Sequence, residues 1–174
     1  MHHLGNGVTL VLGGARSGKS KFAEQLVLES GLEPVYVATA QIWDEEMRDR
    51  IDEHVKRRGK KWHLVEATHD LEAALQQADD ASRGIIDDCL TLWLTNLLLA
   101  EADIHARFAS LLEQLKSMQA PVVLVSSEVG MGIVPENKMA RVFRDHAGRL
   151  HQNLAEMATE VFLVAAGLPM KIKG

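Results

Sequence analysis

The chain has 174 residues, of which 47% are apolar and 25% are charged, so its composition is that of an average globular protein. This length predicts a single domain, residues 1–174, with a core that needs neither disulfides nor structural metal. The net charge of −5 argues against general nucleic-acid binding, so we expect no nucleic-acid partner. Cys89 is the only cysteine, and no run approaches the roughly 20 apolar residues of a membrane span. We therefore expect a cytoplasmic protein without a membrane span.

Short apolar runs rich in β-branched residues alternate with stretches of helical period, which predicts a parallel sheet covered by helices. The expected strands are Val8–Leu12, Val35–Ala38, Leu64–Val65, Gly84–Asp88, Val122–Ser126 and Val161–Ala165. The expected helices are Lys19–Glu29, Asp44–Arg58, Leu71–Ala78, Thr91–Ala100, His105–Met118 and Lys138–Met157. Met170–Lys173 is either an edge strand or a loose tail. Right-handed crossovers make a three-layer α/β domain with a mainly parallel central sheet the expected fold.

The strongest motif lies between the first strand and the first helix, where the pattern G-x-x-x-x-G-K-[ST] is complete. Its residues are Gly13, Gly14, Ala15, Arg16, Ser17, Gly18, Lys19 and Ser20. The glycines let backbone N–H groups surround a phosphate, Lys19 can reach the β and γ phosphates, and the Ser20 hydroxyl can bind Mg²⁺. The motif refines the fold to a P-loop NTPase-like domain and predicts a bound nucleotide, without saying which.

The expected helix Asp44–Arg58 begins with acidic residues and becomes strongly basic toward its end. Met47, Ile51 and His54 share one helical face, and Lys56, Arg57, Arg58, Lys60 and Lys61 follow closely. One interpretation is a helix whose cations complement its dipole while His54 merely packs. The other is an imidazole nucleophile that attacks phosphorus beside cations that hold a triphosphate.

A metal-binding acid is expected at the end of a neighbouring strand in a phosphate-loop enzyme. Asp87 and Asp88 both end the Gly84–Asp88 strand. Successive strand residues point to opposite faces, so one of the two is expected to face the phosphates, and spacing does not say which. Either aspartate could instead cap the following helix.

The segment Glu128–Asn137 follows the fifth strand and reads Glu-Val-Gly-Met-Gly-Ile-Val-Pro-Glu-Asn. Loops at the carboxyl ends of parallel strands line the ligand crevice of α/β sheets. This loop is therefore either a partly apolar wall for a bulky substrate or subunit, or a plain connection. In the last helix, Arg141 with Asp145 and Asp145 with Arg149 are spaced for solvent-side ion pairs.

These motifs together resemble the bifunctional adenosylcobinamide kinase/adenosylcobinamide-phosphate guanylyltransferase family of cobalamin biosynthesis. The resemblance runs from about Val8 to Lys173, and the segment Glu128–Asn137 is its most specific part. It implies phosphorylation of adenosylcobinamide by ATP or GTP, followed by transfer of GMP from GTP to give adenosylcobinamide-GDP. The partners that it implies are adenosylcobinamide, its phosphate and further copies of the chain in a homo-oligomer, a trimer.

The resemblance also implies site residues. His54 would be the guanylylated nucleophile, Lys19 would act on the phosphates, and Ser20 and Asp88 would bind Mg²⁺. Besides the phosphate loop, the residues implied in nucleotide binding are Ala38, Thr39, Ala40, Gln41, Val55, Lys56, Arg57, Arg58, Glu66 and Asp88. Of these, Glu66 belongs to no motif visible from spacing.

Three residues depart from the family pattern: Asp87 where an apolar residue is expected, Ser127 where Asn often precedes Glu-Val-Gly, and His151 where Asn often follows Gly-Arg-Leu. They leave the phosphate loop and His54 unaffected. Two other functions compete with the implied one. The chain could be a P-loop small-molecule kinase without nucleotidyltransferase activity, or a nucleotide-binding switch without metabolite chemistry.

Overall fold

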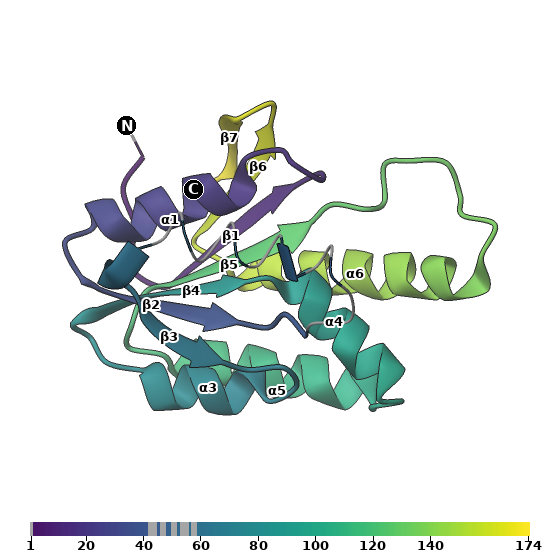
Figure 1. Ribbon diagram of the computed structural model, residues 1–174, viewed down its shortest axis with the longest axis horizontal. Coiled ribbons are helices and arrows are strands. Elements are labelled where there is room, and N and C mark those ends of the chain that lie inside the picture. The colour runs from purple at the N-terminus through teal and green to yellow at the C-terminus, as the bar shows by residue number, and fades with distance from the viewer. Residues whose placement is uncertain (1, 42–44, 46–47, 50–51, 53–55, 57–58) are drawn as a thin grey trace.

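The computed structural model describes the whole chain except residues 1, 42–44, 46–47, 50–51, 53–55 and 57–58. Within the described residues, one seven-stranded sheet forms the centre of the molecule (Figure 1). Its strands are β1 (Val8–Gly13), β2 (Glu33–Ala38), β3 (His63–Glu66), β4 (Arg83–Asp88), β5 (Val122–Ser127), β6 (Glu160–Ala165) and β7 (Leu168–Lys173). Their order across the sheet is β3-β2-β4-β5-β1-β6-β7, and every neighbouring pair is parallel except β6 with β7.

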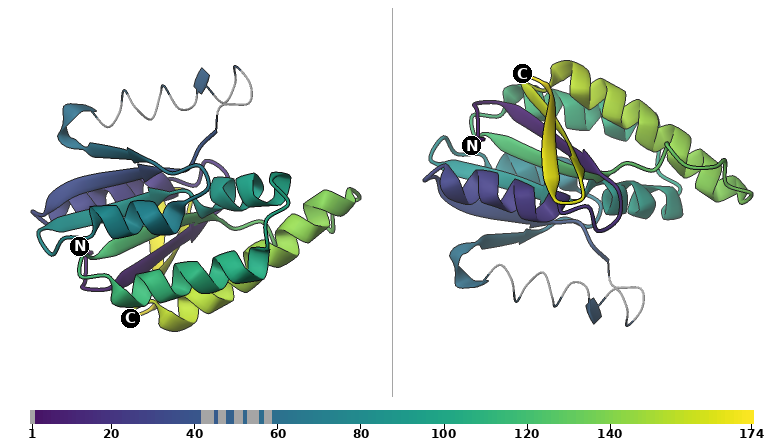
Figure 2. Two further views of the ribbon diagram at one scale, coloured as in Figure 1. Left: turned by 90° about the horizontal axis from the view of Figure 1, so that it is seen from below. Right: turned by 90° about the horizontal axis from the view of Figure 1, so that it is seen from above.

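Helices cover both faces of this sheet and make the expected three layers (Figure 2). They are α1 (Lys19–Glu29), α3 (Leu71–Ala78), α4 (Leu90–Leu99), α5 (Ile104–Ser117) and α6 (Lys138–Met157), with a 3-10 turn η1 (Gly59–Lys61) before β3. α1 packs its buried Phe22 and Leu26 on one face of the sheet. α3, α4, α5 and α6 pack on the other face, around Trp93 and Leu111. The predicted fold class is therefore confirmed.

The alternation of strand side chains separates two cores. In β4, Ile85 belongs to the core under α3–α6, and Ile86 belongs to the core under α1. The ends of two helices are set by side chains, because Asp103 and Asn137 accept hydrogen bonds from the N–H groups of Ala106 and Ala140 at the starts of α5 and α6. Polar side chains thus fix where apolar stretches become helical.

Two expectations from the sequence concern the C-terminal segment and the helix over Asp44–Arg58, and the second is described only in part. Leu168–Lys173 is an edge strand, β7, rather than a loose tail. Most of the expected helix, with His54, lies outside the described residues. The described positions Glu45, Arg48, Asp49, Asp52 and Lys56 are helical. None of the described helices is long and apolar enough to cross a membrane.

Asp87 is a polar residue in the apolar layer between the sheet and α3–α6. Its side chain is fully buried, it lies on the same face as Ile85, and neither carboxylate oxygen has a hydrogen-bond partner among the described residues. Burial, and then the negative charge of Asp88, raise the pKa of Asp87 well above its usual range. An unsatisfied polar group in this layer destabilises the fold.

We expect the substitution Asp87→Val to raise the free energy of unfolding by about 1–3 kcal/mol, because it removes this unsatisfied group. The measurement is urea unfolding at neutral pH. Asp79→Val is the matched control: its carboxylate accepts the N–H groups of Gln119 and Ala120 at 2.9 and 2.8 Å, so its loss should lower stability. An unchanged or lower midpoint for Asp87→Val would contradict this account.

Candidate nucleotide site

The phosphate loop joins β1 to α1 with tight local packing. A Cβ atom on Gly13 would lie 2.4 Å from Ser17 Oγ and 2.7 Å from the Val164 carbonyl oxygen, so no larger residue fits. Gly18 caps α1 with a φ of 93°, a conformation that suits glycine. Gly14, Ala15 and Arg16 are exposed, and Arg16 also has a positive φ, of 53°. The loop therefore presents its middle residues to solvent from a rigid base.

Lys19 and Ser20 form the first turn of α1 and are half-buried. Lys19 Nζ donates a hydrogen bond to the Gly14 carbonyl at 3.0 Å, so the lysine folds back across the loop. The start of α1 also carries the positive end of the helix dipole. A phosphate over the loop would meet backbone N–H groups, this dipole and the Lys19 ammonium together.

Asp88 lies on the α1 face of the sheet, because it alternates with the buried Asp87 on the other face. Its carboxylate accepts a hydrogen bond from the Tyr36 hydroxyl at 2.8 Å. Asp88 pairs with Val125, which pairs with Val11 of the phosphate-loop strand. Two strand spacings, about 10 Å, therefore separate Asp88 from Val11. Of the two aspartates, only Asp88 shares a face with α1.

The strand register brings separate predicted site residues into one row at the carboxyl edge of the sheet. Glu66 of β3 pairs with Ala38 of β2, and Ala38 pairs with Asp88 of β4. Glu66 is exposed, and Ala38 and Asp88 are half-buried. No spacing along the chain could have placed Glu66 here, since the row depends on which strands are neighbours.

Thr39, just after β2, holds two strand ends together. It is fully buried, and its hydroxyl donates to the Cys89 carbonyl at 2.7 Å and accepts from the Cys89 N–H at 2.9 Å. The buried Asn96 of α4 donates to the Thr39 and Thr68 carbonyls, each at 2.8 Å. The Thr39 hydroxyl is thus engaged within the protein, and the half-buried Ala40 and Gln41 follow it. Sequence reasoning missed Asn96, although a polar residue inside the apolar run of α4 is a usable signal.

The basic segment of the site is only partly described. Lys56 is helical and exposed, and Lys61 ends η1 on the surface. The predicted site residues His54, Val55, Arg57 and Arg58 lie outside the described residues. Their assignment stays a prediction.

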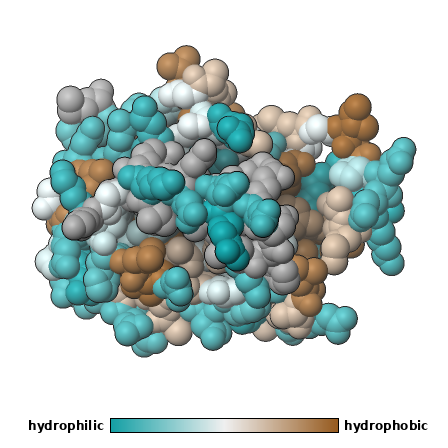
Figure 3. Space-filling view, in the orientation of Figure 1, coloured by the Kyte–Doolittle hydropathy of each residue, from teal (hydrophilic) through white to brown (hydrophobic). Residues whose placement is uncertain are grey.

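The loop after β5 starts against the phosphate loop, because the Glu128 N–H donates to the Gly13 carbonyl at 2.9 Å. The Glu128 carboxylate accepts the N–H groups of Gly130 and Met131 at 2.6 and 3.2 Å, which folds the loop back on itself. With the start of α6, this loop projects from the body as an arm (Figures 1 and 2). The side chains of Met131, Ile133 and Val134 are 77%, 97% and 59% exposed, and Figure 3 shows apolar surface on the arm.

A partly buried hydrogen-bonded group lies at the start of this loop. His151 Nε2 of α6 is 2.7 Å from Ser126 Oγ, and Thr91 Oγ1 accepts the Ser127 N–H at 2.7 Å. Burial lowers the pKa of His151, and the charge of Glu128 opposes this shift. His151 is thus a half-buried histidine whose Nε2 is hydrogen-bonded at the end of β5.

His151 predicts a pH dependence of stability. Since its pKa is lowered by folding, the unfolded chain binds this proton first as the pH falls below about 6.5, and the folded state loses stability. We expect His151→Asn to lose less stability than the wild type between pH 7.5 and pH 5.5, measured by urea unfolding. The control His63→Asn, at an exposed position of β3, should keep the wild-type slope. Parallel slopes for His151→Asn and wild type would refute the assignment.

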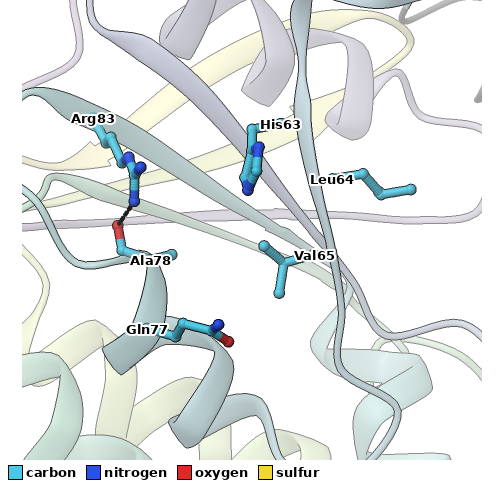
Figure 4. A pocket seen from close by; sticks show the side chains of 6 residues that line it. All are labelled: His63, Leu64, Val65, Gln77, Ala78 and Arg83. Atoms are coloured by element: carbon cyan, nitrogen blue, oxygen red, sulfur yellow. Dashed lines mark hydrogen bonds between the residues drawn. The ribbon is translucent and has the colours of Figure 1, made fainter.

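A pocket of about 400 Å³ lies at the outer edge of the sheet, between β3 and α3 (Figure 4). It is lined by His63, Leu64, Val65, Gln77, Ala78 and Arg83. An adjoining pocket of about 320 Å³ shares Val65 and Gln77 with it and reaches Glu66. The first pocket contains no predicted site residue, and the second meets the predicted site only at Glu66.

Comparison with known proteins points to the same family as the motifs. The family model described as cobinamide kinase / cobinamide phosphate guanyltransferase matches residues 9–172. The bifunctional adenosylcobalamin biosynthesis protein CobP of Pseudomonas aeruginosa is 47% identical over 167 residues, which cover 95% of this chain and 96% of that protein. The bifunctional adenosylcobalamin biosynthesis protein CobU of Escherichia coli strain K12 is 42% identical over 179 residues, covering 94% and 98%.

The fold is shared more widely. A solved structure from Pyrococcus horikoshii OT3 superposes with a TM-score of 0.52 at 12% identity, covering 99% of this chain and 88% of that one. At that identity it shows a common fold alone. The family match and the two relatives decide the identity: the chain belongs to the cobinamide kinase / cobinamide phosphate guanyltransferase family of cobalamin biosynthesis.

Proposed function

We propose that this chain carries both activities of its family in one domain, residues 1–174. It phosphorylates adenosylcobinamide with ATP or GTP, and it then transfers GMP from GTP to the product to give adenosylcobinamide-GDP. The observation that carries the proposal is the family match over residues 9–172, which includes the whole phosphate loop and the row Glu66–Ala38–Asp88. A chain of this length has one phosphate loop to serve both reactions.

In the kinase step, the loop from Gly13 to Ser20 binds the triphosphate through its backbone N–H groups. Lys19 leaves the Gly14 carbonyl and binds the β and γ phosphates, where it stabilises the charge that develops during transfer. The phosphoryl group passes to the aminopropanol hydroxyl of adenosylcobinamide: a bond forms between that oxygen and the γ-phosphorus, and the bond from the γ-phosphorus to the β–γ bridging oxygen breaks. The nucleoside diphosphate leaves, and the hydroxyl proton passes to water. The rate depends on positioning and charge rather than on a covalent enzyme intermediate.

The donor set fits a magnesium ion. The Ser20 hydroxyl and the Asp88 carboxylate are oxygen ligands, which Mg²⁺ prefers, and Asp88 lies on the α1 face. Among the described residues no group of three or more His, Cys, Asp or Glu forms a closed metal cage. Bound there, Mg²⁺ would draw its remaining ligands from phosphates and water and neutralise phosphate charge.

In the transferase step, an imidazole nitrogen of His54 attacks the α-phosphorus of GTP. An N–P bond forms, the bond from the α-phosphorus to the α–β bridging oxygen breaks, and pyrophosphate leaves. A phosphate oxygen of adenosylcobinamide phosphate then attacks the same phosphorus, which breaks the N–P bond and frees His54. Two displacements of this kind are covalent catalysis and give ping-pong behaviour.

The remaining nucleotide contacts are assigned to residues at the same edge of the sheet and in the basic segment. They are Ala38, Thr39, Ala40, Gln41, Val55, Lys56, Arg57, Arg58, Glu66 and Asp88. The shared register of Glu66, Ala38 and Asp88 supports this set. The Thr39 hydroxyl and carbonyl already have hydrogen-bond partners within the protein, Cys89 and Asn96.

We further propose that the protein works in the cytoplasm as a homotrimer. The exposed Met131, Ile133 and Val134 of the projecting arm, with Met139 at the start of α6, support an association of subunits. Apolar side chains grouped in this way are typical of contact surfaces. Sedimentation analysis should give three times the chain mass, and a monomer would contradict the proposal.

A single assay tests the function. The purified chain is mixed with adenosylcobinamide, ATP, GTP and Mg²⁺, and the corrinoid products are separated and weighed by mass spectrometry. The proposal predicts adenosylcobinamide phosphate first and adenosylcobinamide-GDP next. Accumulation of the phosphate alone would support a small-molecule kinase without transferase activity. An unchanged corrinoid would overturn the proposal.

A further inference from the structure

The turn between β6 and β7 touches the phosphate loop directly. The Gly167 N–H donates a hydrogen bond to the Ser17 carbonyl at 2.8 Å. Ala166 and Gly167, at the tip of the turn, have φ values of 51° and 78°, and both residues are exposed. The hydrogen bond therefore joins a surface turn at the edge of the sheet to the phosphate loop that follows β1, the neighbour of β6.

The backbones also approach closely at two points. A Cβ atom on Gly18 would lie 3.1 Å from the Gly167 Cα, and one on Gly13 would lie 2.7 Å from the Val164 carbonyl oxygen. β6 and its turn thus contact both the start and the end of the phosphate loop. The loop has a fixed wall on this side, while Gly14, Ala15 and Arg16 remain exposed.

We propose that Gly167 is a positioning residue for nucleotide binding. Its N–H fixes the direction of the Ser17 carbonyl, and with it the peptide that leads into Gly18 and Lys19. A loop that binds phosphate through backbone N–H groups needs these peptides oriented before the ligand arrives. The inference rests on the proposed function, because it assumes that the triphosphate binds to this loop. It adds that the β6–β7 hairpin, which lies outside the phosphate-loop motif, contributes to the affinity for nucleotide.

The chain contains a matched control for this position. Gly167 and Gly31 both have a φ of 78°, and a Cβ atom on either would meet nothing within 4 Å. Gly167→Ala and Gly31→Ala therefore impose the same backbone strain without a clash. The two positions differ in their surroundings. Gly31 lies in the turn after α1, whereas the Gly167 N–H donates a hydrogen bond to the Ser17 carbonyl of the phosphate loop. A general loss of stability would affect both variants equally.

The experiment measures GTP and ATP dissociation constants by titration calorimetry, steady-state constants for both reactions, and urea midpoints. We expect similar midpoints for the two variants. Gly167→Ala alone should weaken nucleotide binding by roughly tenfold and raise KM more than it lowers kcat, because the loop is less ordered before binding. Gly167→Asn should restore most of the affinity, since asparagine tolerates a positive φ.

Two results would overturn the inference while leaving the proposed function intact. One is a Gly167→Ala variant that binds nucleotide as tightly as the wild type. The other is an equal loss of affinity in Gly31→Ala. If the wild-type chain itself binds neither GTP nor ATP, the proposed function fails, and the positioning role fails with it.

Discussion

Replacing Lys19 by alanine is expected to lower both the kinase rate and the GMP-transfer rate by about 10²–10³-fold. Both reactions place a triphosphate in one loop, and both develop negative charge on the phosphate groups that the Lys19 ammonium reaches. In the kinase step this charge lies on the transferring γ-phosphoryl group, and in the transferase step it lies on the departing pyrophosphate. One substitution should therefore impair two chemically different reactions, measured as separate initial rates of adenosylcobinamide phosphorylation and of GMP transfer.

The fold should survive this change. Lys19 makes one exposed hydrogen bond, to the Gly14 carbonyl, and its loss should alter the free energy of unfolding by no more than about 0.5 kcal/mol. Lys21→Ala is the matched control, because Lys21 is an exposed lysine two residues further along the same helix. It should keep both rates. Normal GMP transfer in Lys19→Ala would mean that the two reactions use separate phosphate sites.

The sequence predicted those elements that are determined by short-range patterns, namely the phosphate loop and most of the helices. The phosphate loop could be predicted from the sequence because its glycines are required by steric constraints within the motif itself. At Gly13, for example, there is no space for a Cβ atom. α1, α3 and α6 have the expected bounds. α4 (Leu90–Leu99) is shifted by one residue from the expected Thr91–Ala100, and α5 begins one residue earlier than expected, at Ile104. The reason is the side chain of Asp103, which caps the helix by binding the Ala106 N–H. Helix ends depend on such single contacts.

Features that depend on strand order could not be predicted. Strand alternation predicted that Asp87 and Asp88 face opposite sides of the sheet. It could not predict which of the two shares a face with α1, because that depends on the side on which α1 packs. Glu66, Ala38 and Asp88 form one row only because β2 lies between β3 and β4 in the sheet. The contact between Gly167 and Ser17 joins positions 150 residues apart in the chain, and it follows from β6 pairing with β1. Strand register and strand order are set by tertiary packing, so local sequence patterns do not predict them.

The second large effect concerns His54, and its test separates the two halves of the proposed function. Incubation of the wild type with GTP labelled at the α-phosphorus should leave label on the protein, acid-labile and alkali-stable as a phosphoramidate should be. His54→Ala should take up none, and its GMP-transfer rate should fall by at least about 10³-fold. Phosphorylation of adenosylcobinamide should stay within a few-fold of wild type, since Lys19 and the loop are intact.

His63→Ala is the control for this variant, because His63 is an exposed histidine of β3 that lies outside the proposed chemistry. It should label like the wild type. Label that persists in His54→Ala would mean that another residue is the nucleophile. A wild type that takes up no label would contradict the transferase half of the proposal and support the kinase activity alone. Lys19→Ala and His54→Ala therefore form a pair: the first should impair both reactions and the second only one, a pattern that two chemistries sharing one phosphate loop produce and two independent sites do not.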